Sequence, residues 1–220
     1  MKENHLHFTF TARYFKLGEI TPDTSEVWFV LHGYGQLARY FLKKFSVLKK
    51  KGICVIAPEG LSRFYLEDVE VRHAGGSNRV GATWMTRENR EMDIENYLAY
   101  LQSVYDHELS NIALTKITIL GFSQGAATAT RWVLQGKVNF HRLIIWAGAF
   151  PNDIDFQIGR KFLSSKEVIT VYGKQDPFLT PVRMEEMELL TQKLGLQPRH
   201  ISFEGRHEIN EDGLGQILRS

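Results

Sequence analysis

The stretch KITILGFSQGAA, residues 116–127, decides the fold class of this chain. Its first half, KITIL, is a short apolar run typical of a strand that is buried on both faces. Its second half opens an alanine-rich helix at Gln124, directly after Gly121-Phe122-Ser123. A buried strand that turns at once into a helix is the building unit of a parallel α/β sheet.

The same alternation continues on both sides of this stretch. Strands are predicted at residues 7–15, 26–31, 53–57, 143–146, 167–172 and 200–203. Helices are predicted at residues 36–51, 87–109, 124–136 and 181–194, with a short helix after residue 209. Repeated units of this kind predict a doubly wound α/β architecture, in which a mostly parallel sheet carries helices on both faces.

One section, residues 61–86, fits neither pattern and contains the turn signal Gly75-Gly76-Ser77-Asn78. We interpret it as a cover over a binding site. The chain has no other long insertion, so we expect no large lid domain. Residues 1–220 are therefore expected to form a single α/β domain.

Composition narrows the class of protein. The 220 residues are 43% hydrophobic and 24% charged, which is typical of a globular protein. A net charge of +2 gives no electrostatic case for nucleic-acid binding. Cys54 is the only cysteine, which excludes an intrachain disulfide and a multi-cysteine zinc site. We find neither a signal peptide nor a membrane-spanning run, and we expect a cytoplasmic protein.

The sequence Gly121-Phe122-Ser123-Gln124-Gly125 matches the G-x-S-x-G motif in its required strand–turn–helix setting. Such a turn holds the serine in a strained conformation and leaves no room for side chains at positions 121 and 125. The alternative is an ordinary glycine-rich turn with a surface serine. The position between strand and helix favours Ser123 as a nucleophile.

A nucleophilic serine needs a base to accept its proton. His200 and His207 both follow Ser123 near the end of the chain, but His200 begins a strand and lies at the wrong edge of the sheet. His207 follows the last strand, at the edge where open α/β sheets bind ligands. We therefore choose His207 as the general base, the alternative being a solvated loop histidine.

The acid that orients the imidazole is expected between the serine and the histidine. Asp176 follows a strand directly, and the order Ser123, Asp176, His207 matches the nucleophile–acid–base order of the α/β-hydrolases. Asp153 stays in reserve because it follows the preceding strand, and Asp155 lies further into that loop. The alternative for Asp176 is a turn-forming residue before proline.

An oxyanion hole needs backbone N–H groups beside the serine. The loop Gly33-Tyr34-Gly35-Gln36 follows an early strand, and its glycines allow a close backbone approach. We expect the amides of Tyr34 and Gln124 to form the hole. His32 is interpreted as a structural histidine packed under this loop.

The segments LHGYGQ, GFSQG, YGKQDP and GRHE, in this order, resemble the phospholipase/carboxylesterase branch of the α/β-hydrolases. That group includes carboxylesterases and acyl-protein thioesterases with lysophospholipase activity. The resemblance spans residues 26–207 and implies catalytic roles for Ser123, Asp176 and His207, with oxyanion roles for Tyr34 and Gln124. The chain departs from the family at Tyr34 and Gln36, where Leu and Asp are commoner.

Together these observations predict a serine hydrolase of carboxylic esters that needs no metal or cofactor. The expected partner is a small-molecule ester or thioester. An acyl-protein thioesterase, a small peptidase and a non-catalytic ligand-binding module remain alternatives. Four residues of the 61–86 section are candidates either for the substrate pocket or for the core beneath a long loop: Phe64, Tyr65, Trp84 and Met85.

Overall fold

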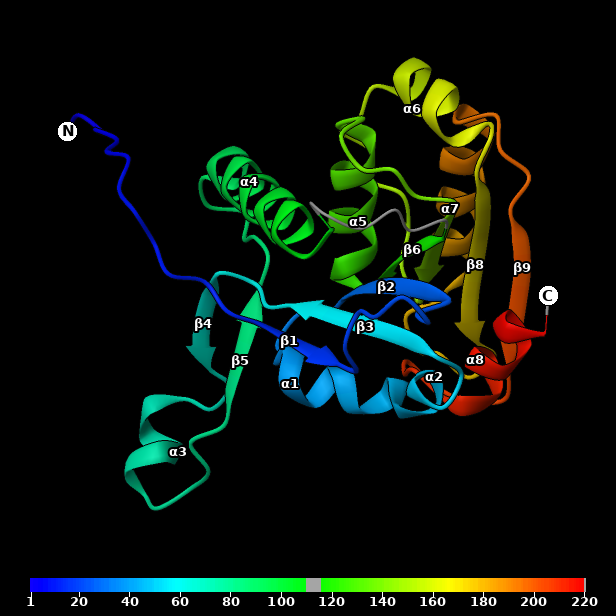
Figure 1. Cartoon of the computed structure of the whole chain (residues 1–220). Coiled ribbons are helices and arrows are strands. Elements are labelled where there is room, and N and C mark those ends of the chain that lie inside the picture. The colour runs from blue at the N-terminus through cyan, green and yellow to red at the C-terminus, as the bar shows by residue number, and fades with distance from the viewer. Residues whose placement is uncertain (110–115, 220) are drawn as a thin grey trace.

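The computed structural model describes residues 1–109 and 116–219, and its framework is a seven-stranded sheet (Figure 1). The strand order is β1-β3-β2-β6-β7-β8-β9, with β1 antiparallel to β3 and every other pair parallel. The strands are β1 Tyr14–Leu17, β2 Glu26–Leu31, β3 Ile53–Pro58, β6 Ile117–Phe122, β7 Arg142–Trp146, β8 Glu167–Gly173 and β9 Arg199–Phe203. Because the six parallel strands share one direction, their carboxyl ends meet at one edge of the sheet.

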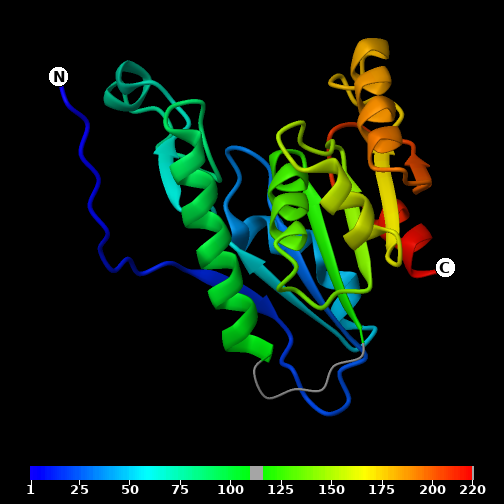
Figure 2. The same cartoon turned by 90° about the horizontal axis from the view of Figure 1, so that it is seen from above.

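Helices cover both faces of this sheet. On one face lie α4 Arg90–Leu109, α5 Gln124–Leu134 and α6 Phe156–Leu163, which Figure 2 shows from above. On the other lie α1 Ala38–Phe41, the 3₁₀ helix η1 Leu42–Phe45, α2 Ser46–Lys49 and α8 Glu211–Leu218 (Figure 1). The helix α7 Pro181–Lys193 ends against α6, where the Arg160 guanidinium donates to the Lys193 carbonyl at 3.3 Å. The predicted doubly wound α/β architecture is confirmed.

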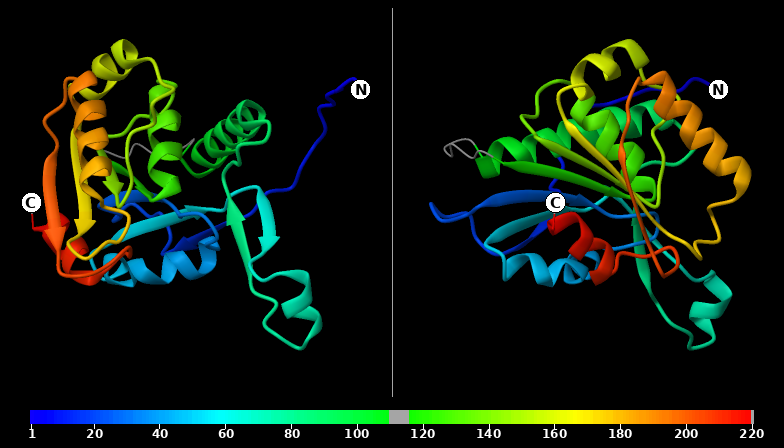
Figure 3. Two further views of the ribbon diagram at one scale, coloured as in Figure 1. Left: turned by 180° about the vertical axis from the view of Figure 1, so that it is seen from behind. Right: turned by 90° about the vertical axis from the view of Figure 1, so that its right-hand side faces the viewer.

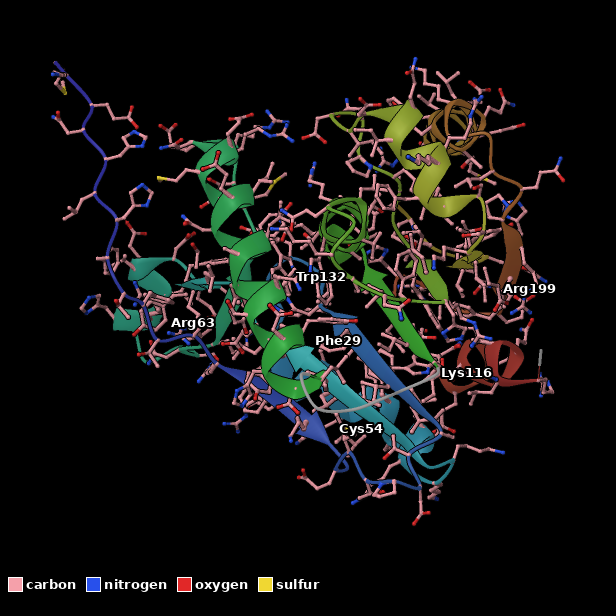
Figure 4. All side chains as sticks on the ribbon, turned by 45° about the horizontal axis from the view of Figure 1, so that its top comes forward. Phe29, Cys54, Arg63, Lys116, Trp132 and Arg199 are labelled. Carbon is pink, nitrogen blue, oxygen red and sulfur yellow. The ribbon has the colours of Figure 1, made fainter. Side chains whose placement is uncertain are left out.

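Alternate residues of β2 show how the sheet separates two cores. Phe29 packs on the face of α4 and α5, where its ring meets that of Trp132 edge-on at 5.5 Å (Figure 4 labels both residues). Its neighbour Trp28 packs on the other face with the residues of α1, α2 and α8. Both faces of β2 are fully buried, as its continuous apolar run predicts.

The leading strand is shorter than predicted. Only Tyr14–Leu17 pairs with β3, while residues 7–13 have no regular structure and the rings of Phe8 and Phe10 are exposed. The alternating pattern before Tyr14 is that of a strand, but β3 has no residues left for it to pair with, since Pro58, the last of the strand, is already opposite Tyr14.

The single helix predicted at residues 36–51 is also wrong, because the structure divides it into α1, η1 and α2. The buried side chains explain this division. Leu42, Phe45 and Leu48 follow one another at intervals of three and are all buried. A 3₁₀ helix aligns residues three apart, so η1 buries Leu42 and Phe45 together, and Leu48 of α2 joins them in the same core cluster.

The section at residues 61–86 forms an antiparallel hairpin of β4 Ser62–Tyr65 and β5 Val80–Thr83, with the short helix α3 Val69–His73 between the strands. Figure 3 shows that α3 projects away from the sheet. The hairpin also joins the loop after β2, because Gln36 pairs with Ala82.

His32 directly follows β2 in a fully buried position, and both of its ring nitrogens have hydrogen-bond partners. Nδ1 donates to the Gly33 carbonyl at 2.8 Å, and Nε2 accepts from the Gly60 amide at 2.9 Å. The Trp84 indole stacks on the imidazole at 5.0 Å and donates to the His32 carbonyl at 2.8 Å. Burial lowers the pKa of His32 from 6.5 to about 4, against opposing effects of the Gly33 hydrogen bond and Glu59. The histidine is therefore a neutral structural residue.

This buried histidine predicts a loss of stability in acid. The unfolded chain binds a proton at His32 as the pH falls below about 6.5, whereas the folded chain resists protonation until about pH 4. The free energy of unfolding should therefore fall with pH across this window, by on the order of 2 kcal/mol between pH 6.5 and 4.5 from this residue. Denaturant unfolding of wild type and His32→Asn at several pH values measures it. The variant should be less stable throughout, with a shallower decline in acid, and parallel declines would contradict the assignment.

Candidate active site

Ser123 occupies the tight turn between β6 and α5 and has a left-handed backbone conformation, with φ at +54°. Glycines on both sides make the turn possible. A Cβ at Gly121 would lie 2.2 Å from the Gly125 carbonyl oxygen, and one at Gly125 would lie 2.3 Å from that of Leu31. The Ser123 amide donates to the Trp146 carbonyl at 2.9 Å. The surrounding backbone thus holds a strained serine at the carboxyl edge of the sheet.

Asp176 and His207 meet at the same edge. Asp176 follows β8, and its side chain is 1% exposed. Its Oδ1 accepts from the Phe178 amide at 2.9 Å, and its Oδ2 lies 2.7 Å from Nδ1 of His207. With a carboxylate as acceptor, Nδ1 is the donor, so the neutral imidazole presents Nε2 as the free base.

The loop that carries His207 is fastened to the ends of β8 and β7. The Gln175 amide donates to the Gly205 carbonyl at 2.9 Å, and the Trp146 indole donates to the Glu208 carbonyl at 2.8 Å. Gly173 allows the close approach, because a Cβ there would lie 2.4 Å from the Gly205 oxygen. The orientation of the base is therefore fixed by backbone contacts as well as by Asp176.

Ser123, Asp176 and His207 border one open cleft of about 1050 Å³. The imidazole ring packs between Phe122, at 4.9 Å, and Phe178, at 4.7 Å. Among the described residues the hydrogen bonds include the histidine–aspartate pair but none between Ser123 Oγ and His207. Such contacts in hydrolases often tighten only when substrate is bound.

The loop after β2 runs against the serine. A Cβ at Gly33 would lie 3.1 Å from Cβ of Ser123. The Gly33 amide donates to Gln36 Oε1, and the Gly35 amide to the Ala82 carbonyl, both at 2.9 Å. The Gln36 amide donates to the Gly33 carbonyl at 3.2 Å. Within the described structure, the Tyr34 amide is therefore the backbone N–H of residues 33–36 that has no hydrogen-bond acceptor.

The second expected oxyanion donor is the first residue of α5. Gln124 begins that helix, where backbone N–H groups have no acceptor within the helix. The positive end of the helix dipole favours negative charge at this place. Tyr34 and Gln124 both border the cleft beside Ser123.

The other acidic and basic candidates have partners other than Ser123, Asp176 and His207. Asp153 pairs with the guanidinium groups of Arg131 and Arg90. Asp155 caps α6 by accepting from the Gln157 and Ile158 amides. His200 is the second residue of β9 and bonds to the Thr170 hydroxyl at 2.6 Å, away from the cleft. Cys54 is buried in β3, and burial raises the pKa of its thiol to about 11.

The four pocket candidates are placed differently from one another. Met85 borders the cleft. Trp84 is buried on His32, and Tyr65 is half exposed with its ring under the Arg72 guanidinium at 4.0 Å. Phe64 packs against the Tyr34 ring at 5.1 Å, so it supports the loop after β2 from the side. The structure brings Met85 alone of the four to the cleft that Ser123 borders.

The residues that line most of the cleft were not expected from the sequence. They come from the loop after β7, from the loop between β8 and α7, and from α7, none of whose residues is buried. The apolar members are Ala147, Ala149, Phe150, Pro151, Phe178, Leu179, Val182, Met187, Leu189 and Leu190. The spacing of apolar residues in α7 predicts a helix, but it does not indicate whether these residues pack in the core or line a cleft.

The described parts of the chain contain no group of three or more His, Cys, Asp and Glu side chains placed to hold a metal ion. Among the helices of residues 1–109 and 116–219, none combines the length and apolar character that crossing a membrane requires.

Comparisons with known proteins identify the fold and the family of this chain. The chain superimposes on an acyl-protein thioesterase 2 from Zea mays with a TM-score of 0.67 and 16% identity, covering 95% of this chain and 97% of the other. It superimposes on a phospholipase/carboxylesterase from Dyadobacter fermentans with a TM-score of 0.66 and 17% identity, covering 97% and 98%. At such identities the likeness establishes the α/β-hydrolase fold alone. No curated protein sequence matches the chain. The family model for phospholipases and carboxylesterases matches residues 20–220, and the chain therefore belongs to the phospholipase/carboxylesterase family.

Proposed function

We propose that this chain hydrolyses carboxylic esters, with Ser123 as nucleophile, His207 as general base and Asp176 as the residue that orients the imidazole. The observation that carries the proposal is the 2.7 Å hydrogen bond between His207 and a buried Asp176, on the cleft that a strained Ser123 also borders. A surface serine in an ordinary turn would have no such pair beside it.

In the first step His207 Nε2 accepts the Ser123 Oγ proton as Oγ attacks the acyl carbonyl carbon. The negative charge that forms on the carbonyl oxygen is stabilised by the Tyr34 and Gln124 amides. When the tetrahedral intermediate collapses, the carbon–oxygen bond to the alcohol breaks, and His207 donates its proton to the leaving group. A water then attacks the acyl-enzyme with His207 again as base, and the acid and free serine are released.

The neighbouring groups suit each role. Asp176 keeps the proton of the neutral imidazole on Nδ1 and stabilises the imidazolium that forms during the attack. The oxyanion donors are backbone groups, so they need no reorganisation as charge develops. The apolar wall of α7 and the loop after β7 offer a surface for the acyl or alcohol part of the substrate.

Site variants test the assignment directly. Ser123→Ala and His207→Ala should lower kcat by about 10⁴–10⁶-fold and abolish labelling by a fluorophosphonate, because both remove the activated nucleophile. Asp176→Asn should lower kcat by about 10⁴-fold, since it allows the wrong tautomer. Intact-mass spectrometry of labelled protein and steady-state hydrolysis of a p-nitrophenyl ester measure these effects.

Asp153→Asn is the matched control for Asp176→Asn. Asp153 lies in the same part of the sequence but is paired with Arg131 and Arg90, so the variant should keep kcat close to wild type. Equal losses in the two aspartate variants, or a label that survives in Ser123→Ala, would contradict the proposed triad. Ligand binding by calorimetry without turnover in well-folded wild type would favour a binding module instead.

The leaving group is tested with matched substrates that share one acyl chain and differ only in the bond that breaks. An oxygen ester, a thioester and an amide separate an esterase, a thioesterase and a peptidase by their kcat/KM. We expect the oxygen ester to be cleaved and the amide to be resisted.

The wall of α7 predicts a chain-length effect. Val182 borders the cleft and Met184, on the same helix, does not, although both are substantially exposed. Val182→Ser should lower kcat/KM for p-nitrophenyl octanoate by about 3- to 10-fold, because it removes apolar contact, and leave the acetate unchanged. Met184→Ser should change neither substrate. Equal effects of the two variants would show that α7 does not contact the acyl chain.

A further inference from the structure

Residues 82–85, at the end of β5, contact the neighbourhoods of both expected oxyanion donors. The segment is hydrogen-bonded to the loop that carries Tyr34 and to the side chain of Gln124. On one side, the Ala82 amide donates to the Gln36 carbonyl at 3.2 Å, and the Ala82 carbonyl accepts from the Gly35 amide at 2.9 Å. These two bonds hold the loop that carries Tyr34.

On the other side, the same strand end is bound to the side chain of Gln124. Its Oε1 accepts from the Trp84 amide at 3.1 Å, and its Nε2 donates to the Met85 carbonyl at 2.9 Å. The Thr83 hydroxyl accepts from Nε2 at 3.0 Å and donates to the Met85 carbonyl at 2.8 Å. Thr83 is 3% exposed, so these bonds form away from water.

We infer that residues 82–85 set the spacing of the oxyanion hole, with Thr83 and the side chain of Gln124 as positioning residues. The inference rests on the proposed function, since it concerns the same two amides. An oxyanion hole works only if its donors sit where charge will develop, and a misplacement of about 1 Å costs on the order of 100-fold in rate. One segment bonded to both donor-bearing elements fixes their separation.

Two glycines allow the backbone of this segment to pack closely against its neighbours. A Cβ at Gly81 would lie 2.5 Å from the Gly35 carbonyl oxygen, so the hairpin and the oxyanion loop touch through their backbones. A Cβ at Gly60 would lie 2.5 Å from the Thr83 carbonyl oxygen, which places the end of β3 directly behind the segment. The strand end is thus held between β3, the oxyanion loop and α5.

The test removes the Thr83 hydroxyl and compares the effect on the transition state with the effect on folding. Thr83→Val should lower kcat by about 10- to 100-fold with KM nearly unchanged, because the lost positioning acts only on the developing oxyanion. Affinity for an alkyl trifluoromethyl ketone, whose adduct with the serine carries an oxyanion, should fall by the same factor. Thr83→Ser keeps the hydroxyl and should restore kcat.

Thr130→Val is the matched control. Thr130 is a fully buried threonine of α5 whose hydroxyl donates to the Ala126 carbonyl at 2.9 Å, and within the described parts of the chain it forms no hydrogen bond to the hairpin. It should lower the Tm as Thr83→Val does but leave kcat and ketone affinity intact. If the two variants lose kcat equally, or if Thr83→Ser fails to restore it, the inference is overturned.

A second readout does not depend on turnover. In ¹⁵N-labelled protein the amide resonances of Tyr34 and Gln124 should both shift in Thr83→Val and in Gly81→Ala, and neither should shift in Thr130→Val. As a glycine control, Gly215→Ala in α8 adds a methyl group that would lie 3.8 Å from the Arg219 guanidinium, and it should leave both resonances in place. If wild-type protein does not hydrolyse esters but both amide resonances shift in Thr83→Val, the proposed function alone is refuted. If wild type is active but the two resonances do not shift together in Thr83→Val, the positioning role is refuted.

Discussion

The backbones of β2, β6 and α5 approach one another around Ser123 more closely than any side chain permits. A Cβ at Gly121 would lie 2.2 Å from the Gly125 carbonyl oxygen, and one at Gly125 would lie 2.3 Å from that of Leu31. The Gly33 backbone lies beside the side chains of Phe122 and Ser123, where a Cβ would be 3.0 and 3.1 Å from their nearest atoms. These contacts fix the direction in which the serine leaves the sheet and the distance of the loop after β2 from it. The strained φ of Ser123 is maintained by these contacts, not by the preference of the residue.

The two walls of the cleft are built on different physical principles. One wall carries the polar pair Asp176 and His207, which hydrogen bonds to each other and to backbone groups hold in place. A second wall, from α7 and the loop after β7, is mainly apolar, and no residue of α7 is buried. A rigid polar wall suits the transfer of a proton, whereas an open apolar wall suits the binding of a variable group.

The sequence predicted those parts of the molecule that depend on local order along the chain. Ser123 directly follows β6, and Asp176 and His207 lie in the loops just after β8 and β9. Parallel strands bring such positions to one edge of the sheet. The prediction failed where the outcome depends on a distant partner. Residues 7–13 alternate like a strand, but β3 ends opposite Tyr14. For Trp84 the sequence left pocket and core open, and the structure places it in the core, because its indole binds the carbonyl of His32, which lies 52 residues earlier.

The helix α7 borders the cleft but contributes no buried residue to the core, and this has a consequence for how the substrate range of such a fold can change. Most core substitutions destabilise a domain, and that loss limits which changes a lineage accepts. No residue of α7 is buried, so its cleft-facing positions are largely released from this limit. New substrate ranges are therefore accessible through α7 by single steps that leave the folded framework and the reacting groups intact.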